Sequence, residues 1–268
     1  MSVHSPVITL LTDFGTRDAY VGIMKGVILG INPDAHIVDL THEVAAQQIQ
    51  PAALILRSAV RVFPAGTIHV AVVDPGVGGS RRPILIETDA GWLIGPDNGV
   101  LSLAAATLGR RGVRAIENDA LLRHPVSQTF HGRDVFAPAA AHLSRAVAPE
   151  SFGPPLASIV ELAIPAVRRS ASTLAGEVIA VDHFGNLITN IDADAILSFP
   201  AQVVSVSIED KRVAGPVRAY SAVSEGTALA IVGSWGMVEI AVRNGSAAQM
   251  FAAGPGTPVT VVLETRDA

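Results

Sequence analysis

The stretch TIHVAVVDPGVGGSR, residues 67–81, decides the predicted fold. Its first seven residues form a nearly continuous apolar and β-branched run, which is typical of a strand buried on both faces of a parallel sheet. Asp74 follows this run directly, and Pro75 and Gly76 end it, because proline lacks the N–H group that a strand ladder needs. We therefore predict a central buried strand whose carboxyl end leads into a polar, glycine-rich loop.

Strand and helix patterns alternate on both sides of this central strand. Apolar runs predict further strands, two of them joined by the tight turn Asp89–Gly91, and apolar residues at helical spacing predict helices between them. These elements are strands 7–11, 36–40, 84–88 and 92–94 and helices 20–29, 50–63, 101–108 and 137–148. The alternation predicts an α/β domain with a mostly parallel sheet.

The character of the chain changes between residues 149 and 165, where four prolines and Gly153 interrupt a weakly periodic segment. Beyond it the helical patterns nearly vanish, and short strand-like runs separated by glycine-bearing turns predict a small all-β domain, a barrel or sandwich. The expected strands are 176–181, 203–208, 229–232, 238–241 and 259–263. We predict an N-terminal α/β domain over 1–165 and a smaller, barrel-like β-domain over 172–268.

Composition excludes several classes of function. Of the 268 residues 49% are hydrophobic and 16% charged, the net charge is −5, and basic residues occur in no run longer than a pair, so no nucleic-acid partner is expected. The absence of cysteine excludes disulfides, thiolate metal sites and a thiol nucleophile. With no signal-peptide pattern and no apolar run long enough for a membrane span, we expect a cytoplasmic location and no membrane partner.

Polar groups that follow predicted strands are the first candidates for a site. Asp13 and Asp74 lie where ligands bind in open α/β sheets, outside the carboxyl ends of the strands. Arg81 and His131 lie in glycine-bearing loops and complete a catalytic inventory of carboxylate, guanidinium and imidazole. Each also has a purely structural interpretation: a helix N-cap for Asp13, a surface salt bridge for Asp74 with Arg81, and a packing role for His131.

Other polar motifs are open to similar structural interpretations. Asp134 could cap a following helix, residues 97–99 form a turn signature, and residues 182–186 are ordinary hairpin chemistry. Ser234 and Glu239 offer polar groups in what the pattern predicts as a loop between strands. A zinc or manganese site from Asp13, His42, Asp74 and His131 is disfavoured, because the spacings match no known ligand motif and Arg81 would repel the cation. We expect no metal and no cofactor.

Seven motifs, in order along nearly the whole chain, resemble those of the S-adenosyl-L-methionine hydroxide adenosyltransferases, hydrolase relatives of the fluorinase and chlorinase enzymes. The motifs are Thr12-Asp13-Phe14-Gly15, Asp18 to Gly26, Asp39 to His42, Val73 to Gly78, Pro96 to Gly99, Thr129 to Asp134 and Asp182 to Asn186. The resemblance implies that hydroxide displaces methionine from the ribose C5′ of S-adenosylmethionine and leaves adenosine.

The resemblance also implies roles for individual residues. Asp74, Arg81 and His131 match the set that handles water, and Asp13 matches the position that holds the ribose hydroxyls. In the β-domain, Asp182 and Asn186 match positions that contact the methionine end, and Ser234 matches a contact to its carboxylate. Residues 244–247, among them Asn244, Ser246 and Ala247, match the segment that faces adenine, and Phe184 is expected to line the same pocket. From the residues alone we add Glu239, a polar group nearby, to the expected substrate contacts. Sites of this family form between neighbouring subunits of a trimer, so a homotrimer is implied.

Departures from the halogenating branch separate this chain from it. Val77 and Gly132 stand where the halogenases have a threonine and a halide-contacting serine, and the extended loop of the halogenases is absent between Thr88 and Trp92. Gln47 and Ile188 replace two large aromatic residues. Two alternatives to hydrolysis stay open at this point: a non-catalytic S-adenosylmethionine or adenosine-binding protein, and a halide-dependent 5′-halogenase.

Overall fold

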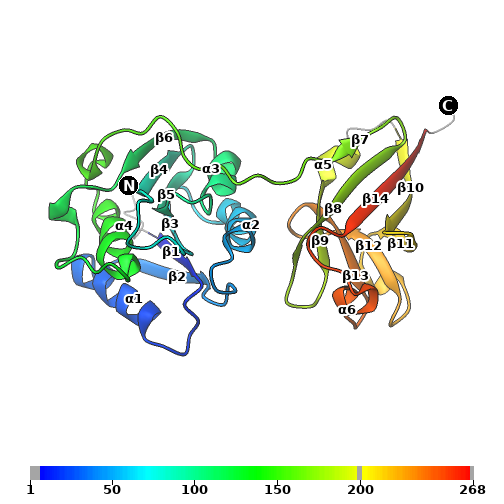
Figure 1. Ribbon diagram of the computed structural model, residues 1–268, viewed down its shortest axis with the longest axis horizontal. Helices are drawn as coiled ribbons and strands as arrows, with labels where there is room; N and C mark the ends of the chain where they lie inside the picture. Colours follow the sequence, from blue (N-terminus) through cyan, green and yellow to red (C-terminus); the bar gives the residue numbers. More distant parts are fainter. Residues whose placement is uncertain (1–6, 198–200, 266–268) are drawn as a thin grey trace. The chain divides into compact units, whose positions relative to one another are not determined.

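The computed structural model describes residues 7–197 and 201–265, and the chain divides into two compact units, Met1–Leu162 and Ala163–Ala268. The predicted fold class is confirmed: the first unit is α/β and the second is a closed β-barrel (Figure 1).

The first unit is built on a six-stranded mixed sheet in the order β2-β1-β3-β5-β4-β6. Strands β1, β2, β3 and β5 run parallel, whereas β4 runs antiparallel to both of its neighbours. The predicted hairpin is present as β4 and β5. The strands are β1 (Val7–Thr12), β2 (His36–Thr41), β3 (Thr67–Val72), β4 (Pro83–Thr88), β5 (Gly91–Pro96) and β6 (Arg110–Ala115).

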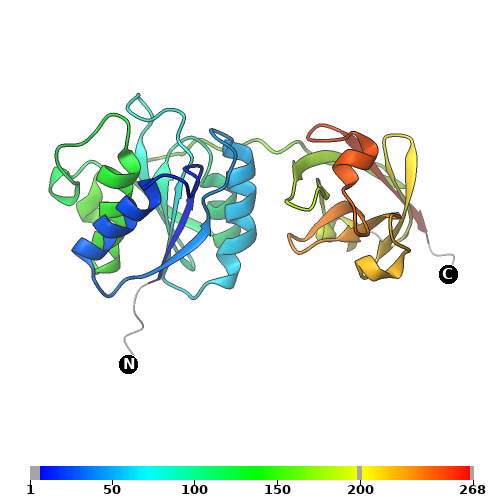
Figure 2. The ribbon, with the colours of Figure 1, turned by 90° about the horizontal axis from the view of Figure 1, so that it is seen from below.

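Helices cover both faces of this sheet. Successive residues of β3 point to opposite faces: Val70 packs with α1 and α4, and Ala71 packs with α2 and α3. Figure 2 shows α1 and α4 on one side of the sheet and α2 on the other. The helical segments are α1 (Tyr20–Ile31), α2 (Ile49–Ala59), α3 (Ser102–Leu108), α4 (Ala137–Ser144), the 3₁₀ turns η1 (Val60–Val62), η2 (Asp119–Leu121) and η4 (Pro149–Phe152), and the π-helical turn η3 (Gly132–Phe136).

The second unit closes into a barrel because β8 pairs with both β9 and β14, which completes the ring β14-β10-β11-β12-β13-β9-β8. A short β7 adds to β8 outside the ring. Closure removes the unpaired strand edges that an open sheet would expose. The elements are β7 (Arg168–Arg169), β8 (Thr173–Val181), β9 (Leu187–Asp192), α5 (Ala193–Leu197), β10 (Ala201–Ile208), β11 (Lys211–Val217), η5 (Tyr220–Ala222), β12 (Ala228–Val232), β13 (Met237–Val242), α6 (Ala247–Phe251) and β14 (Pro258–Thr265).

Some elements differ from the sequence-based expectation. Strands β6, β9 and β11 were not predicted, and the helix expected over 137–148 ends at Ser144. The segment before it, Gly132–Phe136, forms a π-helical turn, which places His131 at its start. Among the described residues, no helix has both the length and the apolar character that crossing a lipid bilayer requires.

His69 on β3 is buried in the sheet, 2% exposed, with its Nδ1 2.8 Å from Thr9 Oγ1. Burial lowers its pKa to about 4. The unfolded chain binds a proton at this residue as the pH falls below 6.5 and the folded chain does not, so folding stability declines as the pH falls. We expect this group to remove about 2.5 kcal/mol of unfolding free energy between pH 7.5 and 4.5. Urea titrations of the wild type and of His69→Gln at both pH values measure the difference; equal pH dependence in the two proteins would contradict it.

Candidate active site

Asp74, Arg81 and His131 meet in the first unit, at the edge of the sheet where β3 ends. Arg81 Nε lies 3.0 and 2.9 Å from the two carboxylate oxygens of Asp74, and Nη2 lies 2.5 Å from both Asp74 Oδ2 and His131 Nδ1. The Asp74 and Arg81 side chains are 5% and 9% exposed. The surface-salt-bridge interpretation of this pair is therefore wrong, because the pair is buried and shared with a third group.

The Arg81 guanidinium determines which ring nitrogen of His131 carries the proton. Arg81 can only donate, so His131 Nδ1 must accept, and a neutral His131 then carries its proton on Nε2. Burial and the adjacent charge of Arg81 lower the pKa of His131, although Asp74 and Asp134 oppose this. The site therefore presents a carboxylate and the N–H group of a neutral imidazole on either side of one arginine.

The loop that carries Arg81 is fixed by its glycines and by the chain beside it. Gly78 has a φ of +75°, and a Cβ there would lie 2.3 Å from the carbonyl oxygen of Gln128. Only glycine permits this close approach to the segment that leads to His131. The Arg81 guanidinium also lies 5.5 Å from the ring centre of the fully buried Phe136. These contacts place the arginine before any substrate binds.

Asp134 holds the His131 turn together and is not a helix cap. Its side chain is fully buried and accepts hydrogen bonds from the Ser127 backbone N–H at 2.9 Å, from Arg133 at 2.7 and 2.8 Å and from Arg123 at 3.2 Å. The N-cap of α4 is Phe136, with no side-chain cap. The cap interpretation is therefore wrong, and Asp134 ties residues 123–127 to the turn that carries His131.

Asp13 is likewise not a cap. The residue that precedes α1 is Ala19, and Asp13 Oδ2 instead accepts the backbone N–H of Gln47 at 2.8 Å. Asp13, Asp74 and His131 all line one cavity of about 400 Å³. Phe14, Tyr20 and Phe130 form one wall of this cavity, with ring centres 5.1 to 5.9 Å apart. The cavity combines an apolar aromatic wall with two carboxylates and an imidazole.

The second unit has a cavity of its own, of about 620 Å³. Of the residues predicted for substrate contact, six line it: Asp182, Phe184, Asn186, Ser234, Glu239 and Asn244. Ser246 and Ala247 do not. Ser246 caps α6 by accepting the Gln249 N–H at 3.2 Å, and Ala247 is fully buried.

Asp182 both forms a turn and faces this barrel cavity. Its Oδ1 accepts the backbone N–H groups of Phe184 and Asn186 at 2.9 and 2.8 Å, and its Oδ2 accepts the Asn186 amide at 2.8 Å. The hairpin-turn interpretation is thus correct for its backbone contacts, and the same carboxylate lines the cavity. Phe184 beside it is 73% exposed.

The predicted substrate contacts did not include Tyr220, Trp235 or Arg243, which line the same barrel cavity. Tyr220 OH donates to Glu239 Oε1 at 2.7 Å. Burial raises the pKa of Glu239, helped by the nearby charge of Asp182 and opposed by the Tyr220 hydrogen bond, and burial with the Glu239 contact raises the pKa of Tyr220 to about 12. No local pattern around Tyr220 connects it with a residue nineteen positions later.

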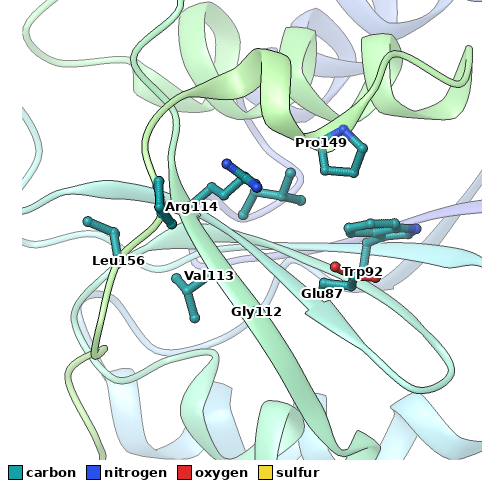
Figure 3. A pocket seen from close by; sticks show the side chains of 9 residues that line it. Glu87, Trp92, Gly112, Val113, Arg114, Pro149 and Leu156 are labelled. Atoms are coloured by element: carbon teal, nitrogen blue, oxygen red, sulfur yellow. The ribbon is translucent and has the colours of Figure 1, made fainter.

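A third hollow, of about 160 Å³, lies against β4, β5 and β6 in the first unit (Figure 3). Its lining includes Trp92, near the amino end of β5, and Arg114. Ligands of open α/β sheets bind outside the carboxyl ends of the parallel strands. This hollow lies against β4, β5 and β6 and contains none of the predicted site residues, so we do not assign the predicted chemistry to it. Among residues 7–197 and 201–265, no group of three His, Asp or Glu side chains could hold a metal ion.

Comparison with known families identifies the chain. Residues 8–153 match the SAM hydroxide adenosyltransferase N-terminal domain, and residues 176–260 match the C-terminal domain of the same family. The chain belongs to this family. The predicted resemblance is confirmed.

Individual relatives agree with the assignment. A protein of Salinispora tropica named (R)-S-adenosyl-L-methionine hydrolase is 38% identical over 262 residues, covering 96% of this chain and 98% of its own, and one of Thermus thermophilus with the same name is 37% identical, covering 94% and 98%. A fluorinase of Actinoplanes is 28% identical over 70% of this chain and 72% of its own. A Thermotoga maritima structure titled as an uncharacterized conserved protein superposes with a TM-score of 0.88 at 39% identity, covering 95% of this chain and 99% of that one.

Proposed function

We propose that this adenosyltransferase-family protein hydrolyses S-adenosyl-L-methionine to adenosine and L-methionine by attack of water on the ribose C5′. The observation that supports this most strongly is the buried Asp74–Arg81–His131 assembly beside the cavity that contains Asp13. The relatives of similar length are named as hydrolases of this compound, and the relatives named fluorinases are more distant.

The reaction needs a positioned nucleophile more than it needs an acid. The water oxygen forms a bond to C5′ while the C5′–sulfur bond breaks. The electron pair of the breaking bond stays on sulfur, and the sulfonium leaves as the neutral thioether of methionine. No proton has to be given to this leaving group. One water proton must be removed, and Asp74 or His131 is the acceptor available in the cavity.

We assign the proton to Asp74. The Nδ1 of His131 is occupied by Arg81, and its Nε2 carries a proton when the ring is neutral, so the ring can donate to the water but not accept from it. Arg81 orients the Asp74 carboxylate and keeps it close to the imidazole. With substrate bound, the aromatic residues that line the cavity would exclude other water and leave one oxygen aligned behind C5′.

The substrate contacts are proposals from the family resemblance and the cavity linings. Asp13 would hold the ribose hydroxyls, and Asp182, Asn186 and Ser234 would bind the methionine end. Adenine would lie near residues 244–247, with Phe184 and Glu239 lining the same space. From the family resemblance we propose a homotrimer in which neighbouring subunits complete each site. The cytoplasmic location stays a prediction.

The names of the relatives point to a stereochemical preference. They specify (R) beside L-methionine, and since the prefix L already describes the α-carbon, (R) describes the sulfonium. We propose that this chain prefers the same sulfonium epimer. Hydrolysis of that epimer would leave the opposite epimer of the compound intact.

Product analysis tests the proposal against its two alternatives. The purified protein is incubated with each sulfonium epimer, with and without chloride, fluoride and a chelator, and the nucleosides are separated by chromatography. We expect adenosine and methionine from the (R) epimer, unaffected by every addition. A 5′-halo nucleoside would identify a halogenase, binding without turnover would identify a sensor, and loss of activity with the chelator would contradict the metal-free assignment.

Gly132 gives a structural reason to expect no halogenase activity. A Cβ at Gly132 would lie 3.1 Å from Met24 Sδ and 3.3 Å from ring atoms of Phe14 and Phe130. The serine that the halogenases carry at this position therefore has little room on this backbone unless the aromatic wall moves. A halide site of that type is not formed by this arrangement.

A further inference from the structure

A buried histidine outside the cavity lining holds the loop that follows β1. His42 is 4% exposed, and its Nδ1 lies 2.9 Å from Oγ1 of Thr12, the last residue of β1. The backbone oxygen of His42 accepts the Gly15 N–H at 2.7 Å, and Thr12 Oγ1 also accepts the Phe14 N–H at 3.2 Å. The loop Thr12–Gly15 is thus held at both ends by one residue.

His42 is itself fixed from the other side. Its Nε2 lies 2.9 Å from Asp39 Oδ1, and Asp39 Oδ2 accepts from Lys25 on α1 at 2.6 Å. Burial alone would raise the pKa of Asp39, but the hydrogen bond from Lys25 and the adjacent imidazole of His42 lower it, so this carboxylate stays charged. The chain of contacts runs from α1 through β2 to the end of β1.

The loop that His42 holds contains two residues of the cavity, Asp13 and Phe14. Among the described hydrogen bonds, Asp13 has one further tether, the Gln47 N–H, which comes from a residue with a left-handed φ of +66°. His42 does not line the cavity, so it has no direct role in the chemistry described above. Its contacts act on the position of Asp13.

We propose that His42 is a positioning residue that sets the place of Asp13 in the substrate cavity through Thr12 and Gly15. The proposal rests on the proposed function for the role of Asp13 as the group that binds the ribose. A loop moved by about 1 Å can cost a large part of the binding or rate that depends on it. Loss of His42 should therefore weaken substrate binding more than it slows the chemical step.

His69 provides a matched control. Like His42 it is a nearly fully buried histidine whose Nδ1 binds a threonine of β1, at 2.8 Å from Thr9 Oγ1, but it has no contact with the Thr12–Gly15 loop among the described hydrogen bonds. We expect His42→Ala at pH 7.5 to raise KM about 10-fold with kcat changed less than 3-fold. We expect His69→Ala to lower Tm by a similar amount and to leave KM unchanged. Equal KM values for the two variants would overturn the proposal.

A double-mutant cycle tests whether the effect passes through Asp13. In an Asp13→Ala background the KM effect of His42→Ala should fall below about 2-fold, because the group being positioned is gone. A full effect that persists there would overturn the proposal. If His42→Ala does not fold, Asp39→Ala removes the partner of His42 at a side chain that is 39% exposed, and the same coupling is expected at smaller size.

Hydrogen exchange separates this proposal from the proposed function. The Phe14 N–H donates to Thr12 Oγ1, which the His42 imidazole holds in place, and the Gly15 N–H donates to the backbone oxygen of His42. Loss of the imidazole should loosen this loop, so we expect both amides to exchange faster in His42→Ala and unchanged in His69→Ala. Unchanged exchange in His42→Ala would overturn the proposal even if the enzyme is active. If the wild type turns over neither epimer, the proposed function fails and the exchange result alone decides whether His42 positions the loop.

Discussion

Replacing Asp74 by Asn is expected to lower kcat for S-adenosylmethionine hydrolysis by about 10³-fold, within the range by which general bases contribute. Asn keeps the size of the side chain but removes the basic oxygen, and its NH₂ group would face the N–H groups of Arg81. The water would then lie behind C5′ with no acceptor for its proton. Initial rates of adenosine formation under saturating substrate measure the effect.

Asp97 is the matched control for this substitution. It follows β5 as Asp74 follows β3, its side chain is 3% exposed, and it is paired with the next arginine, Arg82, and with the Val160 N–H at 2.7 Å. It does not line the cavity that Asp74 lines. Asp97→Asn should lower stability and leave kcat within a few-fold. If Asp74→Asn retains more than a tenth of the wild-type kcat, Asp74 is not the base.

Removing the Asp134 side chain is expected to reduce the unfolding free energy by about 3 kcal/mol, because several hydrogen bonds lose their common acceptor. The carboxylate is fully buried, whereas Arg133 and Arg123 are 28% and 46% exposed and can reach water in the variant. Their exposure keeps the cost below that of a fully buried ion pair. Urea unfolding of Asp134→Ala, followed by circular dichroism, measures the loss.

Glu161 is the control for the Asp134 prediction. It pairs with Arg110 at 2.8 Å on the surface, with side chains 58% and 38% exposed. Exposed pairs of this kind contribute little, so Glu161→Ala should change the unfolding free energy by less than about 1 kcal/mol. Equal losses in the two variants would contradict the view that Asp134 holds the turn before α4.

The sequence was most informative where local chemistry and burial agree. Strands β1 and β3 were predicted because their residues are apolar on both faces, which is what a sheet covered by two helix layers requires. Strand β9 was missed because Thr189 and Asn190 interrupt its apolar run. In the structure they are buried, and Val238 O, Pro165 O and the Glu177 N–H satisfy them.

The candidate site was predictable only in part for the same reason. Asp13 and Asp74 could be found because they follow strands, and Arg81 and His131 because they lie in glycine-bearing loops; the resemblance added their roles. Their spacing from the predicted helices made Asp13 and Asp134 plausible caps. In the structure Asp13 instead accepts the Gln47 N–H, and Asp134 accepts the Ser127 N–H of the preceding segment. His42 and Tyr220 act through partners 30 and 19 residues away, and no local pattern encodes such a contact.

Hydrolysis of the (R) sulfonium epimer in H₂¹⁸O tests the central claim most directly. Attack of water on C5′ predicts adenosine with one ¹⁸O atom in its 5′-hydroxyl group and methionine with none, as read by mass spectrometry of both products. Adenosine without the label, or label in methionine, would contradict the proposed attack of water at C5′ by the Asp74–Arg81–His131 site.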